Sequence, residues 1–598
     1  IAVSLIERLR CRGYALDVRS VFSAPRLTDM AQTIQTQENI PDSVVPPNRI
    51  SADCTVITPD LLPLVTLSQE EIDIIVATVP DGAANVQDIY PLSPLQEGIL
   101  FHHQLQESGD AYLSNSILAF NTRARLEDFL AALQQVIDRH DILRTAFYWK
   151  GLSQPVQVVW RQAKLFVIPF IPTSAENIPA QLQANMPCRL DISQAPLFAA
   201  STTYDPDSDE WLLTLNYHHL VSDHVTLELI IDEIQQVLQG RGESLPAPLP
   251  YRNFIAQTLS VPASVHENYF RQRLAGVDEP TAPFGLLNVQ GDGQAITEAR
   301  LQLDSMLADT LRTLARQLGI SPSVLFHVAW AQVLAHTSGR DDVVFGTVLS
   351  GRLQGTTGAD QVMGMFINTL PIRISLSTQN VREAVLATSR DLAALLEHEQ
   401  APLALAQRCS GVSPPLPLFS VLLNYRHSPS DTGENPGWVG MRVLQSEERT
   451  NYPIALSVDD HGNGFTLTAQ TVDGIAPDRV VHYLLITLSE LADALTADVQ
   501  QPVLSLSILP ASERQQLLVD FNATQADFPQ DALIHELFEQ QVAQTPEAIA
   551  VVCEGQTLSY EQLNRQANQL AHYLIGLGIQ PDDRVAICVE RSPALIVC

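Results

Sequence analysis

The sequence predicts a mixed α/β fold with several hydrophobic cores. Helical and strand patterns alternate along most of the chain, from residue 85 to residue 510. Hydrophobic residues make up 45% of the 598 residues, which is enough to fill several cores, and charged residues only 17%, which argues against extended disorder. At roughly 150 residues per domain, a chain of this length forms about four folded units or fewer large ones.

The N-terminal part of the chain has little regular pattern. Residues 1–36 predict two short helices, the first ending at Gly13 and the second beginning near Pro25. Two such helices are too small to form a domain alone. Residues 37–84 contain the proline-rich stretch IPDSVVPPNRISADCTVITPDLLP, and we expect a linker there, with a short helical stretch, SQEEIDIIVATVP (Ser68–Pro80), after the prolines.

Two blocks of helix and strand patterns follow, and they indicate two lobes of related α/β design. The expected elements are helices at 128–140, 225–240, 304–319 and 321–335, and strands at 211–220 and 341–352. Ser321 is a suitable N-cap for its helix, because its hydroxyl can accept a backbone N–H of the first turn. Pro322 suits the first helical position because it has no N–H that would need an acceptor.

A further unit begins after a break near residues 506–531. A helix, a strand and a second helix are expected at 533–546, 548–555 and 559–578. The chain starts without a methionine, in what we interpret as the middle of a helix, and stops at Cys598 as another helix begins. We therefore expect both ends to be cut.

Composition excludes several classes of partner. A formal net charge of −32 repels phosphate-rich molecules, so we expect no nucleic acid. No apolar run reaches the length of about 18 residues that a membrane span needs, and the N-terminus lacks the features of a signal peptide, so we expect no membrane and a cytoplasmic location. Seven scattered cysteines without zinc-ligand spacing predict reduced thiols and no metal.

Three histidines and an aspartate within HHLVSDH are the strongest candidates for chemistry. The segment lies at a predicted strand end before a helix, and strand alternation sends His218 and His219 to opposite faces. A neutral imidazole at His219 can orient an amine and accept its proton, with Asp223 close enough to orient it. Buried structural histidines are the alternative, but a titratable cluster of this density, which also includes His224, favours function.

HHLVSDH resembles the HHxxxDG signature of condensation domains of nonribosomal peptide synthetases, with His224 in place of the glycine. Other signatures of this family follow in the same order. They are PLSPLQEG (Pro91–Gly98), RHDILRTAF (Arg139–Phe147), YRNF (Tyr251–Phe254), FGTVLSGR (Phe345–Arg352) and GMFINTLPIR (Gly364–Arg373). The resemblance extends over residues 85–510.

The resemblance implies two chloramphenicol-acetyltransferase-like lobes, residues 85–265 and 266–510, that form a V with a tunnel between them. The tunnel joins a thioester donor to an amine acceptor, each delivered by a peptidyl carrier domain, one upstream and one downstream. On this resemblance we expect His219 to contact the amine with His218 beside it, and we expect Asp223 and Arg144 to pair and hold the loop. Asn368 is expected to be structural at the site.

The flanking segments resemble neighbours of such a domain. Residues 1–36 resemble the C-terminal part of a peptidyl carrier domain, whose serine for 4'-phosphopantetheine would precede Ile1. Residues 511–598 are interpreted as a linker and the truncated start of an adenylation domain in cis, because LSYEQL (Leu558–Leu563) resembles that family's first signature. We expect no adenylation by this chain.

A second histidine pair indicates a subclass. The segment from His102-His103 to Gly109-Asp110 resembles the HH[IL]xxxxGD motif of dual epimerisation/condensation domains, as does ERTNYP, which ends at Pro453. His102 and His103 are then candidates to move the Cα proton of the donor. The alternatives are surface histidines of a helix in a plain condensation domain, a stand-alone epimerisation domain, whose EGHGR-like stretch is absent from the sequence, or an inactive scaffold that only docks carriers.

Overall fold

A computed structural model describes residues 5, 8–9, 12, 14–16, 27–36 and 45–598, with the exception of 107–108, 175, 290, 292–295, 353–357, 359–360, 428–439 and 448. The described part separates into two compact units, residues 1–510 and 511–598. The division coincides with the boundary predicted at residue 510. Each unit is described by itself.

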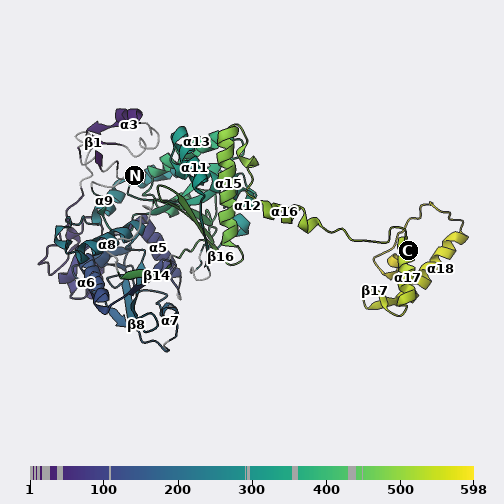
Figure 1. The fold of residues 1–598 in the computed structure, drawn as a ribbon, viewed down its shortest axis with the longest axis horizontal. Coiled ribbons are helices and arrows are strands. Elements are labelled where there is room, and N and C mark those ends of the chain that lie inside the picture. Colours follow the sequence, from purple (N-terminus) through teal and green to yellow (C-terminus); the bar gives the residue numbers. More distant parts are fainter. Residues whose placement is uncertain are drawn as a thin grey trace. The chain divides into compact units, whose positions relative to one another are not determined.

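The first lobe contains a five-stranded sheet in the order β14-β4-β9-β8-β7 and a three-stranded sheet in the order β3-β6-β5 (Figure 1). Helices α6 and α8 pack against each other, and α6 contacts β4 and β9. The elements are β3 (Val86–Pro91), α5 (Pro94–Leu105), β4 (Leu113–Phe120), α6 (Arg123–Arg139), β5 (Thr145–Tyr148), β6 (Val156–Trp160), β7 (Val167–Pro169), α7 (Ile178–Ala184), β8 (Phe198–Asp205), β9 (Glu210–His218), α8 (His224–Leu238) and α9 (Arg252–Ser260).

The second lobe is built on a six-stranded sheet in the order β10-β16-β15-β13-β11-β12. Its elements are α10 (Ala263–Arg273), β10 (Ile296–Gln302), α11 (Ser305–Leu318), α12 (Pro322–Ser338), β11 (Asp342–Leu349), β12 (Asn368–Ser375), α13 (Val381–Leu396), α14 (Leu403–Arg408), β13 (Val421–His427), β14 (Met441–Glu447), β15 (Ile454–Asp460), β16 (Phe465–Val472) and α15 (Pro477–Ala497). The mixed α/β fold and its two sheet-based lobes agree with the prediction.

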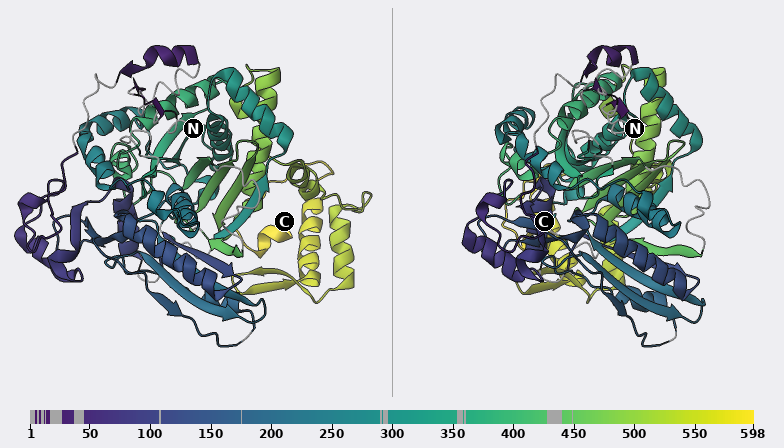
Figure 2. Two further views of the ribbon diagram at one scale, coloured as in Figure 1. Left: turned by 60° about the vertical axis from the view of Figure 1, so that its left-hand side comes forward. Right: turned by 90° about the vertical axis from the view of Figure 1, so that its left-hand side faces the viewer.

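Apolar helices form the core of the second lobe. Helix α12 is capped by Ser321 as predicted, and its interior residues are buried all round, as expected for a helix without a polar face. Helix α15 runs alongside the six-stranded sheet and contacts β10 and β16 (Figure 2). It is long and apolar enough to cross a membrane, but its apolar residues are buried in this core, as in the core helix of a globular domain.

The two lobes exchange segments, which the sequence did not predict. Strand β14 follows β13 in the second lobe, yet it pairs with β4 at the edge of the first lobe's sheet. Residues 362–366 also come from the second half of the chain, and their side chains are buried in the first lobe's hydrophobic core. These exchanges hold the lobes together as one compact unit.

The predicted linker is wrong where its apolar residues are buried, whereas the short helix predicted after the prolines is present as α4 (Gln69–Thr78). Ile50, Ile57 and Leu62 are buried in one hydrophobic cluster with α4 and the three-stranded sheet. A capping box at Ser68 starts α4. The prolines of this segment interrupt regular structure, but the apolar residues between them are numerous enough to cover a sheet face. This segment is therefore part of the first lobe.

The N-terminal segment is described only in part. The structure contains β1 (Tyr14–Ala15), α3 (Leu27–Thr33) and β2 (Gln35–Thr36), and α3 corresponds to the second helix predicted there. Most of the first predicted helix lies outside the described residues, as do Glu107, Ser108 and Glu448 of the motifs.

The second unit contains the elements predicted after residue 531. They are α17 (Ile534–Gln544), β17 (Ile549–Cys553), β18 (Gln556–Ser559), α18 (Tyr560–Gly576) and α19 (Pro593–Val597), with α16 (Ala511–Leu518) before them. Strands β17 and β18 form an antiparallel hairpin, which α18 follows directly.

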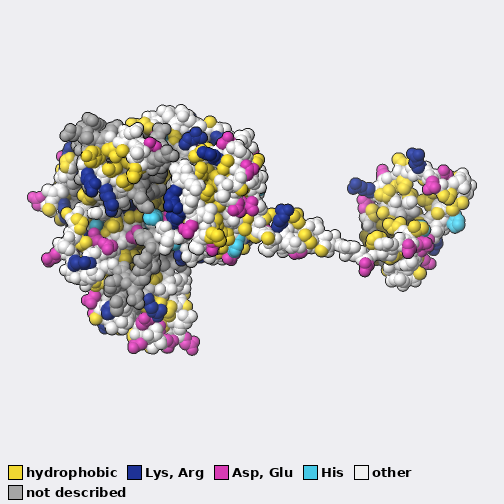
Figure 3. All heavy atoms as spheres, turned by 45° about the horizontal axis from the view of Figure 1, so that its top comes forward, with side chains coloured by type: hydrophobic (Ala, Val, Ile, Leu, Met, Phe, Trp, Pro, Cys, Tyr) yellow, Lys and Arg dark blue, Asp and Glu magenta, His cyan; other side chains and the backbone are white. Residues whose placement is uncertain are grey.

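The acidic character of the chain is spread over its surface. On the face shown in Figure 3, acidic side chains are interspersed with basic and hydrophobic ones over the described residues. This distribution fits solubility better than recognition of one charged partner.

The packing of α4 can be tested with two isoleucines on the same helix. Ile72 is 1% exposed, whereas Ile74 is 47% exposed. Ile72→Ala should lower the free energy of unfolding by about 2–5 kcal/mol, since it leaves a cavity in the core. Ile74→Ala should change it by less than about 0.5 kcal/mol. Urea unfolding measures both, and two equally neutral variants would restore the linker interpretation.

Candidate active site

The four candidate histidines form two pairs with different surroundings. His102 and His219 both line a cavity of about 200 Å³ whose walls come from both lobes. His103 and His218 do not line it, and they are only 3% and 0% exposed. Only His102 and His219 are therefore placed to meet a substrate in this cavity.

Local structure explains this division. Successive residues of a helix point about 100° apart, so His102 and His103 at the end of α5 face different directions. Residues of a strand alternate, so His218 at the end of β9 points inward. His219 is the first residue after the strand, and its backbone N–H donates to the carbonyl of Tyr112 (3.0 Å).

Asp110 holds the buried pair. Its Oδ2 accepts hydrogen bonds from Nδ1 of His103 (2.7 Å) and Nε2 of His218 (3.0 Å), and its Oδ1 accepts the backbone N–H of Tyr112 (3.0 Å). Nδ1 of His218 accepts the backbone N–H of Leu220 (3.1 Å), which assigns the proton of His218 to Nε2. The cluster therefore fixes the end of α5, which carries His102, and the segment after β9, which carries His219.

The electrostatics of this cluster favour a neutral imidazole at His218. Burial alone would raise the pKa of Asp110, but the hydrogen bonds from the two histidines hold that pKa well below its usual range. Burial lowers the pKa of His218 despite its contact with Asp110. Two histidines and a carboxylate are also a common metal-ligand set, but here each imidazole donates directly to the same oxygen.

We expected all four histidines to be catalytic, but the structure places only His102 and His219 at the cavity. His103 and His218 occupy positions that orient their neighbours, and the structure places them away from the cavity because a fully buried carboxylate needs their N–H groups.

His102 has the properties of a neutral base. Burial lowers its pKa, which Asp110 opposes only in part. Its Nδ1 is buried and has no hydrogen-bond partner among the described residues. The ring of Tyr112 lies beside it, with 5.9 Å between the ring centroids.

Tyr112 links the two lobes across the cavity. Its hydroxyl donates to Oδ1 of Asn451 (3.1 Å), in the ERTNYP segment of the second lobe. Arg449, Asn451 and Tyr452 of that segment line the cavity together with His102 and Tyr112. The two segments that resemble motifs of the dual subclass, which are far apart in the sequence, thus meet at one site.

The predicted pairing of Asp223 with Arg144 is wrong. Asp223 lies 3.2 Å from Nη2 of Arg352, and both side chains are buried. Arg144 instead donates to the carbonyl of Trp160 and to Oε1 of Gln87. Burial lowers the pKa of Arg144, and Asp141 rather than Asp223 opposes this shift most strongly.

Asp223 has several further partners. Its Oδ1 accepts the backbone N–H of Thr226 (2.8 Å) and so caps α8, of which His224 is the first residue. Its Oδ2 accepts the backbone N–H of Phe366 (3.2 Å) from the second half of the chain. Burial alone would raise the pKa of Asp223, but Arg352 and His224 hold it below its usual value.

Asn368 lines the cavity and has a structural role as predicted. Its Nδ2 donates to the carbonyls of Glu399 (2.9 Å) and Ala401 (2.7 Å), which ties the start of β12 to the turn before α14. Sequence reasoning missed Ser114, Tyr112 and Arg352. Arg352 lies inside a quoted signature, so its position was available, whereas nothing in the local pattern distinguishes Ser114 from other strand residues.

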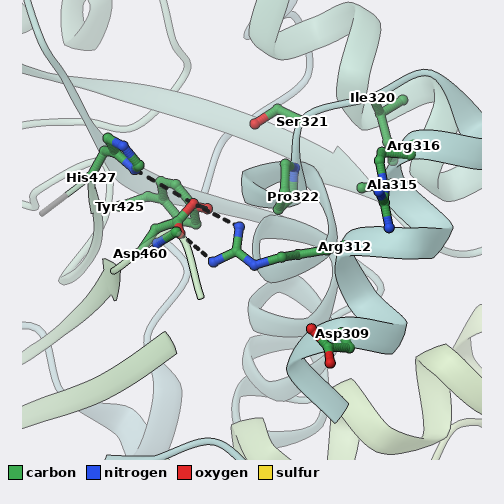
Figure 4. A pocket seen from close by; sticks show the side chains of 11 residues that line it. Asp309, Arg312, Ala315, Arg316, Ile320, Ser321, Pro322, Tyr425, His427 and Asp460 are labelled. Atoms are coloured by element: carbon green, nitrogen blue, oxygen red, sulfur yellow. Dashed lines mark hydrogen bonds and ion pairs between the residues drawn. The ribbon is translucent and has the colours of Figure 1, made fainter. Parts of the chain in front are cut away.

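A larger hollow of about 610 Å³ lies in the second lobe (Figure 4). Asp460 points into it and accepts hydrogen bonds from Arg312, from the hydroxyl of Tyr425 (2.7 Å) and from the backbone of Gly462 (2.9 Å). Arg312 and Asp460 in this hollow therefore satisfy each other. The smaller cavity, which His102 and His219 line, is therefore the better candidate site.

Comparison with known proteins identifies the family of the chain. Residues 86–518 match the family described as condensation domain, and residues 538–598 match the AMP-binding enzyme family. The chain belongs to the condensation-domain family. A condensation domain followed by the start of an adenylation domain is the arrangement of a nonribosomal peptide synthetase, as the sequence predicted.

Curated relatives of this condensation domain are much longer proteins. Malpinin synthetase of Mortierella alpina is 47% identical over the whole of this chain, which spans 8% of that protein. Malpibaldin synthetase of the same organism is 44% identical over the whole of this chain, which spans 11% of that protein. A linear gramicidin synthase of Brevibacillus parabrevis is 32% identical over 90% of this chain, which spans 7% of that protein.

Solved structures share the fold. A four-domain nonribosomal peptide synthetase bound to AMP and glycine superposes with a TM-score of 0.64 at 16% identity, covering 83% of this chain and 39% of that one. The starter condensation domain of rhizomide synthetase superposes with a TM-score of 0.57 at 19% identity, covering 74% and 100%. The predicted chloramphenicol-acetyltransferase-like fold of condensation domains is confirmed.

The corrected ion pair leads to a stability prediction. Asp223→Ala and Arg352→Ala should each lower the free energy of unfolding by about 3–5 kcal/mol, because each leaves the other charge buried and unpaired. The double variant should be much less destabilised than the sum of the two. Urea unfolding of all four proteins gives the coupling energy.

The control cycle combines Asp223→Ala with Arg144→Ala. These two effects should add, since the residues share no hydrogen bond. Coupling in the control cycle, together with additivity in the first, would support the original pairing instead.

Proposed function

We propose that residues 85–510 invert the donor residue at Cα and then join it to the acceptor amine, so that the chain is a dual epimerisation/condensation domain. The observation that supports this most directly is the single cavity lined by His102 and His219, which come from different elements of the first lobe. Peptide bond formation is the activity of the condensation-domain family. The epimerisation step is the finer proposal.

Bond formation needs little from the protein beyond alignment and one proton acceptor. The amine nitrogen attacks the thioester carbon, the C–S bond breaks, and the proton lost by the amine is returned to the departing sulfur. His219 is positioned for that transfer through Nε2, because its Nδ1 donates to the carbonyl of Ser222 (3.1 Å). Holding both substrates in one cavity contributes up to about 7–11 kcal/mol.

Epimerisation places a second demand on the site. The proton on Cα next to a thioester is acidic enough for removal by a positioned base, and inversion requires its return on the opposite face. Two bases on different walls of one cavity satisfy this requirement. His102 suits one of these roles because burial lowers its pKa and favours the neutral form that accepts a proton.

The partners follow from the same chemistry. We propose that the donor and acceptor arrive on 4'-phosphopantetheine arms of upstream and downstream peptidyl carrier domains, with an adenylation domain in cis. The donor arrives already activated as a thioester, so the domain itself needs no covalent intermediate. A plain condensation domain and an inactive docking scaffold are the outcomes against which the experiments below are designed.

His219→Ala should abolish dipeptide formation from loaded donor and acceptor carriers while leaving the melting temperature unchanged within a few degrees. Loss of a positioned proton acceptor slows such a step by about 10²–10⁴-fold. His482→Ala, at an exposed position of α15, is the matched control and should keep the parent rate. A parent-like rate in His219→Ala would show that this histidine is not needed.

The epimerisation step is tested with an L-aminoacyl donor in deuterated buffer. The parent chain should release a dipeptide that carries deuterium at the donor Cα and the D configuration. His102→Ala should block both changes, and it should still condense a chemically loaded D-aminoacyl donor because His219 is intact. Mass spectrometry and chiral chromatography of the dipeptide provide the measurement.

The result that contradicts epimerisation is specific. An all-L dipeptide without deuterium from the parent chain, at a normal rate, would leave a plain condensation domain. No dipeptide from either donor, although both carriers are loaded, would support the scaffold.

A further inference from the structure

The lone pair of His219 that bond formation requires is not open in the resting site. Oγ of Ser114 lies 3.1 Å from Nε2 of His219. Ser114 belongs to β4, is fully buried and does not line the cavity. The imidazole therefore has the cavity on one side and a serine hydroxyl of its own lobe at its basic nitrogen.

The direction of this hydrogen bond follows from the other ring nitrogen. Nδ1 of His219 lies 3.1 Å from the carbonyl oxygen of Ser222, which can only accept, so Nδ1 carries the proton. Nε2 of the neutral ring is then an acceptor. The hydroxyl of Ser114 must donate to it.

Strand β4 thus controls both the backbone and the ring of His219. The carbonyl of Tyr112 accepts the backbone N–H of His219 (3.0 Å), and Ser114, two residues further on, reaches the ring. Ser114 faces Tyr217 in the antiparallel pairing of β4 with β9. The position of the hydroxyl is therefore set by the sheet and not by a flexible loop.

We propose that Ser114 is a positioning residue for peptide bond formation: its hydroxyl donates to Nε2 of neutral His219 in the resting site, turns its hydrogen away when the amine N–H approaches this lone pair from the cavity, and then shares the resulting Nε2–H bond with the substrate as a second acceptor. The proposal rests on the role of His219 proposed above. Rotation about the Cβ–Oγ bond is sufficient, because a hydroxyl is both a donor and an acceptor.

The exchange is balanced in protons. The amine N–H bond breaks and the Nε2–H bond forms, and the same proton later passes to the thiolate sulfur as the C–S bond breaks. Both protonation states of His219 keep a partner. A hydrogen bond from a charged donor is roughly twice as strong as a neutral one, so Ser114 stabilises protonated His219 more than the neutral ring.

Other titratable groups surround this pair, and replacing Ser114 leaves those groups in place. They are His102 and Tyr112 in the cavity wall, His218 and Asp110 behind it, and Arg449 and Tyr452 from the second lobe. A change in pH profile caused by replacing Ser114 can therefore be assigned to the contact with His219.

The experiment measures single-turnover dipeptide formation between about pH 5 and pH 8, with a chemically loaded D-aminoacyl donor that bypasses epimerisation. Ser114→Ala should slow the reaction about tenfold at pH 7, as expected for loss of one hydrogen bond to a charged group. It should also move the acid limb of the profile to lower pH, because the protonated imidazole loses its acceptor.

Rescue and control variants separate positioning from packing. Ser114→Thr keeps the hydroxyl and should restore both the rate and the profile. Ser116→Ala removes a partly exposed hydroxyl from the same face of β4, which lies 3.5 Å from Oγ of Ser446, and should behave like the parent. If Ser114→Ala does not fold, Ser114→Cys replaces it, since a thiol is nearly the same shape but a weak partner.

Two results overturn the proposal, and they are distinguishable. A parent-like rate and profile in Ser114→Ala or Ser114→Cys, with His219→Ala inactive, would show that Ser114 only packs. Full activity of His219→Ala would remove the role of His219 itself, and the role of Ser114 with it.

Discussion

The buried ion pair between Asp223 and Arg352 is the interaction on which the site depends. The two residues come from different halves of the chain, and the same carboxylate caps α8 and holds the backbone of Phe366. His219 lies on the loop between β9 and α8, and Asp223 is the last residue of that loop. A buried ion pair adds little net stability, but it is strongly destabilising when broken, so it acts mainly to fix one geometry. That geometry places a first-lobe histidine against second-lobe walls.

A second buried carboxylate, that of Asp110, binds two of the four histidines and leaves the other two at the cavity. Asp110 takes one N–H from His103 and one from His218, and it thereby joins the end of α5 to the end of β9. The neighbouring residue in each pair is left facing the cavity. Two adjacent histidines thus provide one group that Asp110 holds and one that faces the cavity, and this arrangement occurs twice around the same aspartate.

Much of the fold could be predicted from the sequence, because its signals are local. The periodic apolar residues of α6, α8, α11 and α12 and the alternation of β9 fix their own elements. The placement of His219 at a strand end followed from the same pattern. The apolar residues of the supposed linker before α4 were missed because they have no period, although they cover a sheet face.

Long-range pairing could not be predicted in this way. Arg144 and Arg352 both lie in signatures of the family, and nothing in either segment shows which of them reaches Asp223. The pairing of β14 with β4 and the burial of residues 362–366 in the other lobe have the same origin. Ser114 was missed for a related reason, since only its contact with the distant His219 distinguishes it from other serines in strands.

The central claim is that one donor meets His102 and His219 in a single cavity. The most direct test is a crystal structure of the chain with a donor carrier whose thioester is replaced by a stable amide. The account predicts the donor Cα between the two imidazoles, with one ring nitrogen on each face and within about 3–4 Å, at or just beyond hydrogen-bonding reach. A donor Cα that meets His219 alone, with His102 walled off behind Tyr112, would contradict it.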